Sequence, residues 1–369
     1  MRNISDTLAR LKRLPGGLPL SVPADTRLQS FSHERPNPGN LKAWIYVPGS
    51  ALAGAPLVVV LHGCTQSAAG YDHSSGWSRL ADLHGFVLLY PEQQRANNPN
   101  NCFNWFSEGD ARRGKGEARS IREMVAATQA QYGTDPNRVF VTGLSAGGAM
   151  AVAMLATYPE VFAGGAVIAG LPFGVARSVP EAFDRMRGHG LPTSDELPYL
   201  VRSASDRIED WPTLSVWHGS ADQTVDRSNA FALVEQWRAL HSATEAPDES
   251  DLVQGYPHRL WRDAKGRPVI EEYSITGFGH GAPLDTKGSG HGEQAAPFML
   301  DAGISSTHLI GRFWGIVPEQ VGDHRSNSSA TEGEEPVWPS QAPQPARWSS
   351  QTGVGKTIED ALRSAGLMK

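Results

Sequence analysis

The chemistry-bearing part of the chain begins with a serine between glycines. Residues 143–147 read GLSAG, a G-x-S-x-G pattern in which a serine can attack a carbonyl carbon. With 39 glycines in the chain the string alone is weak evidence, and a glycine-rich turn with an idle serine would look the same. However, the strand-like run RVFVT precedes it and the small-residue helix GAMAVAMLATYP follows it. A strand, a sharp turn and a helix would raise the hydroxyl above a sheet, so Ser145 is the candidate nucleophile.

A serine hydroxyl is a weak nucleophile near neutral pH, so it needs a histidine base and a carboxylate that orients the base. In a fold of this kind the acid and then the histidine follow the serine along the chain. Asp222 follows the run LSVW, and its rival Asp226 better fits the first turn of the next helix. His280 lies in a glycine-flanked loop after IEEYSIT, and its rival His291 is further from any strand. We therefore predict a triad of Ser145, Asp222 and His280.

Two backbone amides are expected to bind the negative oxygen that develops when the serine attacks. One is the amide of Ala146, directly after the nucleophile. The other belongs to the loop HGCTQ after the run Leu57–Leu61, where Cys64 is best placed. His62 and His218 each precede a glycine at a strand end, and we expect them to brace loops by hydrogen bonds.

The chain has two cysteines, Cys64 and Cys102. A disulfide between them would close a loop of about 39 residues and stabilise the fold by roughly 4 kcal/mol, while two reduced thiols fit the sequence equally well. Two thiols alone do not indicate a metal site. If the disulfide forms, it brings the segment CFNWF near the site, with Trp105 and Phe106 as candidate walls of an acyl pocket. Trp217, at the strand end before the predicted acid, is a further candidate substrate contact, although aromatic residues more often fill the core.

Five nearly continuous apolar runs are typical of parallel strands that are covered on both faces. Helical patterns with one apolar face lie between them, including residues 117–131 and 228–241. The repeated strand–helix–strand order predicts a doubly wound, mostly parallel α/β sheet. The runs are Leu57–Leu61, Phe86–Tyr90, Arg138–Thr142, Ala166–Ala169 and Leu214–Trp217.

Antiparallel hairpins are expected at residues 26–33 with 42–47 and at 259–262 with 269–275. Residues 170–211 interrupt the strand–helix rhythm. They predict a helical insert that covers the active site or, as the alternative, two helices packed on the core.

The two ends of the chain differ in composition from its middle. Residues 1–24 form a basic extension without the apolar stretch of a signal peptide, so the default location is cytoplasmic, with secretion or the periplasm as alternatives. The catalytic domain is expected over residues 25–320. Residues 321–353 are rich in Ser, Pro, Gln and Glu, which predicts a linker or surface strap, and residues 354–369 predict a C-terminal docking helix.

The bulk composition excludes several classes of protein. The 369 residues are 40% hydrophobic, as in ordinary globular proteins, and carry a formal net charge of −6. Without a basic stripe, nucleic acid is not an expected partner. No apolar run approaches the roughly 18 residues that span a bilayer. The predicted chemistry needs neither a metal nor an organic cofactor, and the oligomeric state stays open.

The motifs around the predicted triad and the oxyanion loop, taken in their order along the chain, resemble those of the polyhydroxybutyrate depolymerase esterases, relatives of feruloyl and acetylxylan esterases. The resemblance covers most of the chain from about Lys42 onward and implies an α/β-hydrolase fold. It also implies the triad roles of Ser145, Asp222 and His280, with Cys64 at the oxyanion loop. The matching stretches are LHGCTQ, NCFNWF, DPNRVFVTGLSAGGAM, WHGSADQTV, GHGAPLD and PFMLDAGISS, with the tail IEDALRSAGL.

The resemblance also bears on the substrate. Secreted polymer-degrading members carry a signal peptide and an added substrate-binding domain, neither of which is visible here, so soluble short-chain esters or hydroxyalkanoate (3-hydroxybutyrate) oligomers are favoured over solid polymer. We predict hydrolysis through an acyl-serine intermediate. The alternatives are a feruloyl or acetylxylan esterase, an acyltransferase, and a non-catalytic binding protein on the same fold.

Overall fold

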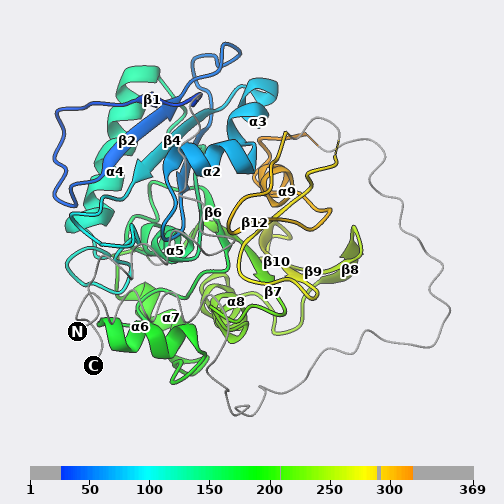
Figure 1. Ribbon diagram of the computed structural model, residues 1–369. Coiled ribbons are helices and arrows are strands. Elements are labelled where there is room, and N and C mark those ends of the chain that lie inside the picture. Colours follow the sequence, from blue (N-terminus) through cyan, green and yellow to red (C-terminus); the bar gives the residue numbers. More distant parts are fainter. Residues whose placement is uncertain (1–25, 208, 289–291, 319–369) are drawn as a thin grey trace, which may run out of the picture.

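The computed structural model describes residues 26–207, 209–288 and 292–318, which form a ten-stranded sheet with helices on both faces (Figure 1). The predicted N-terminal extension, linker and C-terminal docking helix lie outside these residues, as does His291. No helix within the described ranges is long and apolar enough to cross a membrane.

The sheet has the order β1-β2-β4-β3-β5-β6-β7-β10-β9-β8. Its central strands, from β4 to β10 in this order, are parallel, and antiparallel strands flank them on both sides. Both predicted hairpins are confirmed, as β1 with β2 and as β9 with β10. The strands are β1 (Gln29–Ser30), β2 (Lys42–Tyr46), β3 (Leu57–Leu61), β4 (Val87–Glu92), β5 (Val139–Leu144), β6 (Gly164–Ile168), β7 (Thr213–Gly219), β8 (Glu249–Val253), β9 (Tyr256–Arg262) and β10 (Pro268–Ile275), with β11 (Ala282–Leu284) and β12 (Met299–Asp301) as a separate pair.

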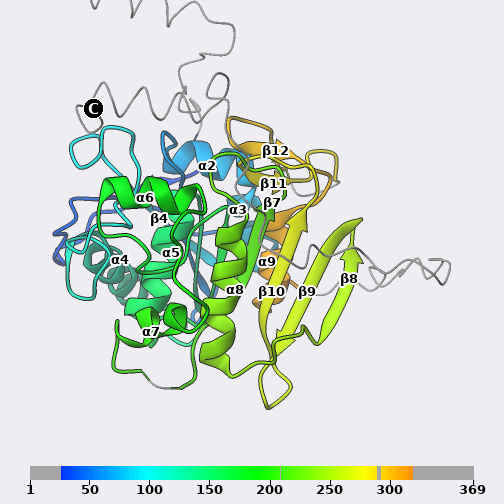
Figure 2. The ribbon, with the colours of Figure 1, turned by 90° about the horizontal axis from the view of Figure 1, so that it is seen from below.

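Helices cover the sheet on both sides, which explains why the central strands are buried along almost their whole length. Every residue of β3 is buried. Side chains alternate across a strand, so Val59 packs in the core cluster under α4, α5 and α8, while Val58 and Val60 pack in the cluster under α3 and α9. Figure 1 shows α8 and α9 on opposite sides of β10, and Figure 2, seen from below, shows α8 in front of the sheet. The helices are α2 (Ala68–Ser75), α3 (Trp77–His84), α4 (Gly116–Tyr132), α5 (Ala146–Thr157), α6 (Val179–Met186), α7 (Glu196–Arg202), α8 (Ser228–His241) and α9 (Ser306–Phe313).

The two helices of the insert at residues 170–211, α6 and α7, lie in different parts of the molecule. The backbone N–H of Asp226 donates to the carbonyl of Met186 (2.7 Å), so the end of α6 lies beside the loop that leaves β7. By contrast, α7 packs on the helical layer, where the side-chain amide of Gln236 on α8 donates to the carbonyl of Leu197 (3.1 Å). One helix therefore lies at the carboxyl edge of the sheet, and the other packs on the core.

Parallel strands end at one common edge of the sheet, and that edge positions the site. Ser145 follows β5, Asp222 follows β7 and His280 follows β10. Because β5, β7 and β10 belong to the parallel part of the sheet, their carboxyl ends bring these three residues to the same edge.

Candidate active site

Ser145 occupies a strained turn between β5 and α5. Its backbone has φ 56° and ψ −118°, a left-handed conformation that is uncommon for a residue with a side chain and typical of functional turns. Its N–H donates to the carbonyl of Ile168 on β6 (2.9 Å), which ties the turn to the sheet. The residue is 9% exposed, and within the described ranges its hydroxyl makes no hydrogen bond. This leaves the oxygen available to a base or a substrate.

The two glycines of the serine motif are required by close backbone contacts. A Cβ on Gly143 would lie 2.4 Å from the carbonyl oxygen of Gly147. A Cβ on Gly147 would lie 2.3 Å from the carbonyl oxygen of Leu61 and 2.5 Å from that of His62. The turn at Ser145 therefore touches the loop after β3 directly, which places the HGCTQ loop beside the predicted nucleophile.

The structure joins the predicted acid and base directly. His280 Nδ1 donates to Asp222 Oδ2 (2.7 Å), and Asp222 Oδ1 accepts the backbone N–H groups of Thr224 (2.8 Å) and Val225 (2.9 Å). Burial alone would raise the pKa of Asp222, but the hydrogen bond and the charge of His280 outweigh it and hold this pKa below its usual value. With Nδ1 committed to the carboxylate, Nε2 of His280 is the nitrogen that can take a proton.

Two further histidines brace the loops around the site, as predicted. His218 Nε2 donates to the carbonyl of Val225 (2.8 Å) and lies 3.7 Å from Asp222 Oδ2. His62 Nδ1 donates to the carbonyl of Gly63 (2.8 Å), and its Nε2 accepts the N–H of Gln93 (3.1 Å). Burial lowers the pKa of both rings, so both act as neutral hydrogen-bonding groups rather than as cations.

The loop after β3 presents one amide that stays unused. The N–H of Gly63 donates to the side chain of Gln66 (2.8 Å), and that of Thr65 donates to the carbonyl of Asn100 (2.6 Å). Between them, the N–H of Cys64 has no acceptor within the described ranges, and neither does that of Ala146 in the first turn of α5. These are the two amides that the sequence predicts as oxyanion donors.

Cys64 and Cys102 form a disulfide, with their Cα atoms 4.2 Å apart. The sequence alone leaves this pairing open. The bridge fixes the segment Cys102–Phe106 against the oxyanion loop, and the ring of Phe103 lies 5.1 Å from that of His62. The prediction that this segment comes near the site therefore has a covalent basis.

The three aromatic residues predicted to contact the substrate differ in how far they are buried. Trp105 is 9% exposed and Phe106 is half-buried, with their ring centres 5.7 Å apart, and their role as pocket walls stays a prediction. The prediction for Trp217 is wrong because its side chain is fully buried. Its ring stacks on Tyr273 (3.8 Å) and its indole N–H donates to Ser215 Oγ (2.8 Å). The side chain points to one face of the sheet instead of leaving its edge, so Trp217 is a core residue.

Asp226, the rival of the predicted acid, belongs to a helix start. Its Oδ1 accepts the N–H of Ser228 (2.9 Å) in the first turn of α8. This is the role that the sequence suggested for it.

Sequence reasoning missed the link between the oxyanion loop and the segment after His280. The side chain of Gln66 accepts the N–H of Gly63 and donates to the carbonyl of Pro297 (3.3 Å). Next to Pro297, Phe298 has a positive φ of 64°, and its ring lies edge-on to that of His280 at 6.0 Å. Gln66 lies in the motif LHGCTQ and Pro297 in the motif PFMLDAGISS, but only the fold shows that these two motifs are in contact.

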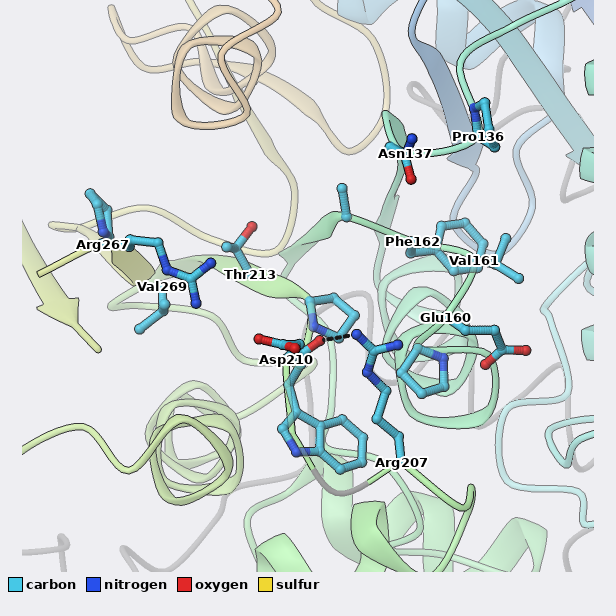
Figure 3. A pocket seen from close by; sticks show the side chains of 15 residues that line it. Pro136, Asn137, Glu160, Val161, Phe162, Arg207, Asp210, Thr213, Arg267 and Val269 are labelled. Atoms are coloured by element: carbon cyan, nitrogen blue, oxygen red, sulfur yellow. Dashed lines mark hydrogen bonds between the residues drawn. The ribbon is translucent and has the colours of Figure 1, made fainter. Parts of the chain in front are cut away.

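A cavity of about 300 Å³ lies at the other edge of the sheet (Figure 3). It is lined by residues that directly precede or begin β5, β6, β7 and β10, among them Asn137, Phe162, Thr213 and Val269. The strands therefore separate this cavity from Ser145.

Known proteins share both the sequence and the fold of this chain. The family model described as Esterase PHB depolymerase matches residues 41–250. A poly(3-hydroxyalkanoate) depolymerase C of Paucimonas lemoignei is 46% identical over 303 residues, 80% of this chain and 71% of that protein. A probable acetylxylan esterase A of Aspergillus flavus is 30% identical over 267 residues, 70% of this chain and 85% of that protein. Among solved structures, an acetyl xylan esterase from Aspergillus awamori matches with a TM-score of 0.63 and 28% identity, covering 69% of this chain and 93% of that chain.

These similarities agree with the architecture. The mostly parallel sheet and the strand–turn–helix at Ser145 are those of the α/β-hydrolase fold, and the similar proteins are named as carboxylic ester hydrolases. Since the family model matches more than half of the chain and the depolymerase is 46% identical, the chain belongs to the Esterase PHB depolymerase family and is a carboxylic ester hydrolase.

Proposed function

We propose that this esterase hydrolyses short-chain esters through an acyl-Ser145 intermediate, with hydroxyalkanoate (3-hydroxybutyrate) oligomers or polymer as its substrate class. The hydrogen bond between His280 and Asp222, at the sheet edge where the strained Ser145 lies, is the observation that carries this proposal. It supplies an oriented base for an otherwise weak nucleophile.

In the first step Ser145 Oγ attacks the ester carbonyl while His280 Nε2 takes the hydroxyl proton. The imidazolium that forms is stabilised by Asp222, whose lowered pKa keeps it ionised. The amides of Cys64 and Ala146 donate to the oxyanion, and each such donor lowers a barrier of this kind by about 3–4 kcal/mol. The alcohol then leaves with the proton from His280.

In the second step His280 takes a proton from water, and the resulting hydroxide attacks the acyl-serine carbonyl. The same two amides bind the second oxyanion. Collapse of this intermediate breaks the bond to Ser145 Oγ, which regains its proton from His280, and the carboxylic acid is released. Every proton is returned, so the cycle needs no other co-reactant than water.

The substrate class is inferred from the relatives. The depolymerase of P. lemoignei shares 46% of aligned residues with this chain, whereas the acetylxylan esterase of A. flavus shares 30%. The second candidate is a feruloyl or acetylxylan esterase, and the fold match to the A. awamori acetyl xylan esterase over 93% of that chain favours it. We expect purified enzyme to prefer 3-hydroxybutyrate oligomers in a panel with methyl ferulate and acetylated xylan, and a preference for either of the others would replace the substrate class while keeping the mechanism.

Replacement of the nucleophile tests the mechanism itself. Ser145→Ala should reduce hydrolysis of p-nitrophenyl butyrate by a factor of about 10⁶, as for triad serines elsewhere, and should abolish labelling by a fluorophosphonate probe. Circular dichroism should show an unchanged fold. Turnover close to that of the wild type would reject Ser145 as the nucleophile, and ester formation with an added alcohol in place of free acid would indicate an acyltransferase.

A further inference from the structure

A buried carboxylate that the mechanism does not use lies behind the oxyanion loop. Glu117 is in the first turn of α4 and is only 1% exposed. Its Oε1 accepts the side-chain amides of Gln93 (2.6 Å) and Asn104 (2.7 Å), and its Oε2 accepts the backbone N–H of Asn104 (2.9 Å). All three partners are donors, so the surroundings fit an acceptor-only group, which is an ionised carboxylate.

The three donors come from two segments that build the oxyanion side of the site. Gln93 follows β4, and besides binding Glu117 its side-chain amide donates to the carbonyl of Cys102 (3.1 Å). The backbone N–H of Gln93 donates to the ring of His62, the first residue of the oxyanion loop. Asn104 lies in the middle of the segment Cys102–Phe106. One carboxylate therefore connects α4, the end of β4 and this segment.

Individual contacts hold the segment Cys102–Phe106: besides those to Glu117 and Gln93, these are the disulfide, the fully buried ring of Phe103 and hydrogen bonds with Asn98. Residues 93–115 contain no helix or strand, so their backbone groups need partners outside regular secondary structure. Buried charged groups form stronger hydrogen bonds than neutral ones, and they position loops more firmly. The disulfide links this segment covalently to Cys64, so the position of the segment also fixes the position of the Cys64 amide, the predicted oxyanion donor.

We propose that Glu117 is a positioning residue for the oxyanion hole, acting through Asn104, Gln93 and the Cys64–Cys102 disulfide on the amide of Cys64. This inference rests on the proposed function, because it takes that amide to bind the oxyanion. Glu117 itself does not touch the substrate. Its loss affects the enzyme chiefly in the transition state, where the oxyanion exists.

The sharpest variant is Glu117→Gln, which keeps the shape but replaces one acceptor oxygen with a donor NH₂ group. That group then faces donors, so at least one of the three hydrogen bonds is lost. Deleting an oxyanion donor costs a factor of 10²–10³ in kcat, and we expect a displaced donor to cost about tenfold, with KM within about a factor of two. Glu117→Asp keeps the charge and should recover part of the loss.

The control is Glu123→Gln on the same helix. Glu123 pairs with Arg35 (3.1 Å) away from the site, so its kcat should equal that of the wild type. All variants are measured on the full chain with p-nitrophenyl acetate and butyrate. Complete labelling with a fluorophosphonate counts the active sites, so kcat is expressed per folded site and a fraction of misfolded protein does not affect it.

A double-mutant cycle tests the route through the disulfide. In a background with Cys64→Ser and Cys102→Ser, Glu117→Gln should lower kcat by less than in the wild type, because the connection to the Cys64 amide is already cut. Equal factors in the two backgrounds would overturn the route. An unchanged kcat per site, or a rise in KM alone, would overturn the positioning role.

These outcomes are separate from failure of the proposed function. If the wild type neither hydrolyses esters nor reacts with the fluorophosphonate, the proposed function fails and the inference fails with it. If the wild type is active and Glu117→Gln matches it, only the inference fails. If Glu117→Gln yields no labelled sites, the Glu117→Asp variant decides, since a kcat per site equal to that of the wild type would overturn the proposal.

Discussion

The acid–base side and the oxyanion side of the site each contain a buried carboxylate that accepts three hydrogen bonds, but the pKa values of the two carboxylates are shifted in opposite directions. Asp222, on the acid–base side, accepts two backbone amides and the ring of His280. Glu117, on the oxyanion side, accepts two side-chain amides and one backbone amide. The pKa of Asp222 is lowered, whereas burial raises the pKa of Glu117 to about 7.

The number of hydrogen bonds does not explain this difference, since it is the same for both. Asp222 is hydrogen-bonded to the ring of His280, and this hydrogen bond together with the charge of that ring lowers the pKa of the carboxyl. Glu117 faces neutral amides and the negative charge of Asp110, which raises its pKa further. Asp222 is thus kept ionised by the histidine that it stabilises. Glu117 has no such partner among the described residues, so its ionisation lowers the unfolding free energy of the protein.

The largest expected effect separates the two carboxylates by role. Asp222→Asn should lower kcat about 10⁴-fold, because an amide no longer fixes the Nδ1–H tautomer of His280 or stabilises the imidazolium. The measurement is kcat for p-nitrophenyl butyrate per site labelled. Asp226→Asn is the matched control, since the side chain of Asp226 accepts the N–H of Ser228 at the start of α8, and this variant should keep kcat within about a factor of two of the wild type. A loss of less than tenfold for Asp222→Asn would contradict its assignment as the triad acid.

A smaller effect tests the contact between the serine turn and the oxyanion loop. Gly147→Ala places a Cβ 2.3 Å from the carbonyl oxygen of Leu61, so one of the two backbones must move. Such overpacking should cost about 3 kcal/mol of unfolding free energy, together with a loss of turnover. Gly49→Ala is the control, because its Cβ meets nothing within 4 Å. Urea unfolding curves that coincide for the two variants would show that the contact is not close in solution.

The last effect is a change of stability with pH and needs no loss of activity. Because the folded-state pKa of Glu117 is about 7 and its ordinary value is 4.5, the folded protein binds this proton more tightly than the unfolded chain. Its contribution is complete below pH 4.5 and is lost as the pH rises through about 7, a change of about 3 kcal/mol. The unfolding free energy of the wild type should therefore fall relative to that of Glu117→Gln over this range. Parallel curves for the two proteins would contradict the raised pKa.

Asp222 contributes with the opposite sign. Its folded-state pKa is lowered, so its contribution is present above the ordinary value and is lost as the pH falls through the folded-state value. A comparison of the wild type with Asp222→Asn should show the difference shrinking on the acid side. The variants Glu117→Gln and Asp222→Asn therefore distinguish the two carboxylates, because their effects on the unfolding free energy change with pH in opposite directions.

The sequence analysis succeeded where a residue's role depends on its neighbours along the chain. The apolar run at β3 and the apolar face of α8 have the predicted bounds, and the loops after β7 and β10 carry the hydrogen-bonded Asp222 and His280. Each of these signals comes from one continuous stretch. The order of strand, turn and helix then fixes the edge at which the stretch ends.

It failed where a role depends on distant contacts. The partners Gln66 and Pro297 are 231 residues apart in sequence, so neither stretch predicts their hydrogen bond. Glu117 reads as an ordinary first-turn carboxylate until the fold surrounds it with Gln93 and Asn104. Trp217 lies near the predicted acid along the chain, but the direction of its side chain depends on the face of β7, which sequence distance does not reveal.

The disulfide also has a consequence for the chain that it encloses. Residues 65–101 contain α2, α3 and β4, and the turn from α3 into β4 lies at the amino end of that strand, at the edge opposite the site. Since the covalent bond holds both ends of this ring together, an insertion in that turn changes the circumference of the ring without changing the distance between its closing residues. The turn itself is fixed by Gly85, which has a positive φ of 72°, and by the fully buried Phe86, so we expect an insertion there to lower stability even though the ring stays closed.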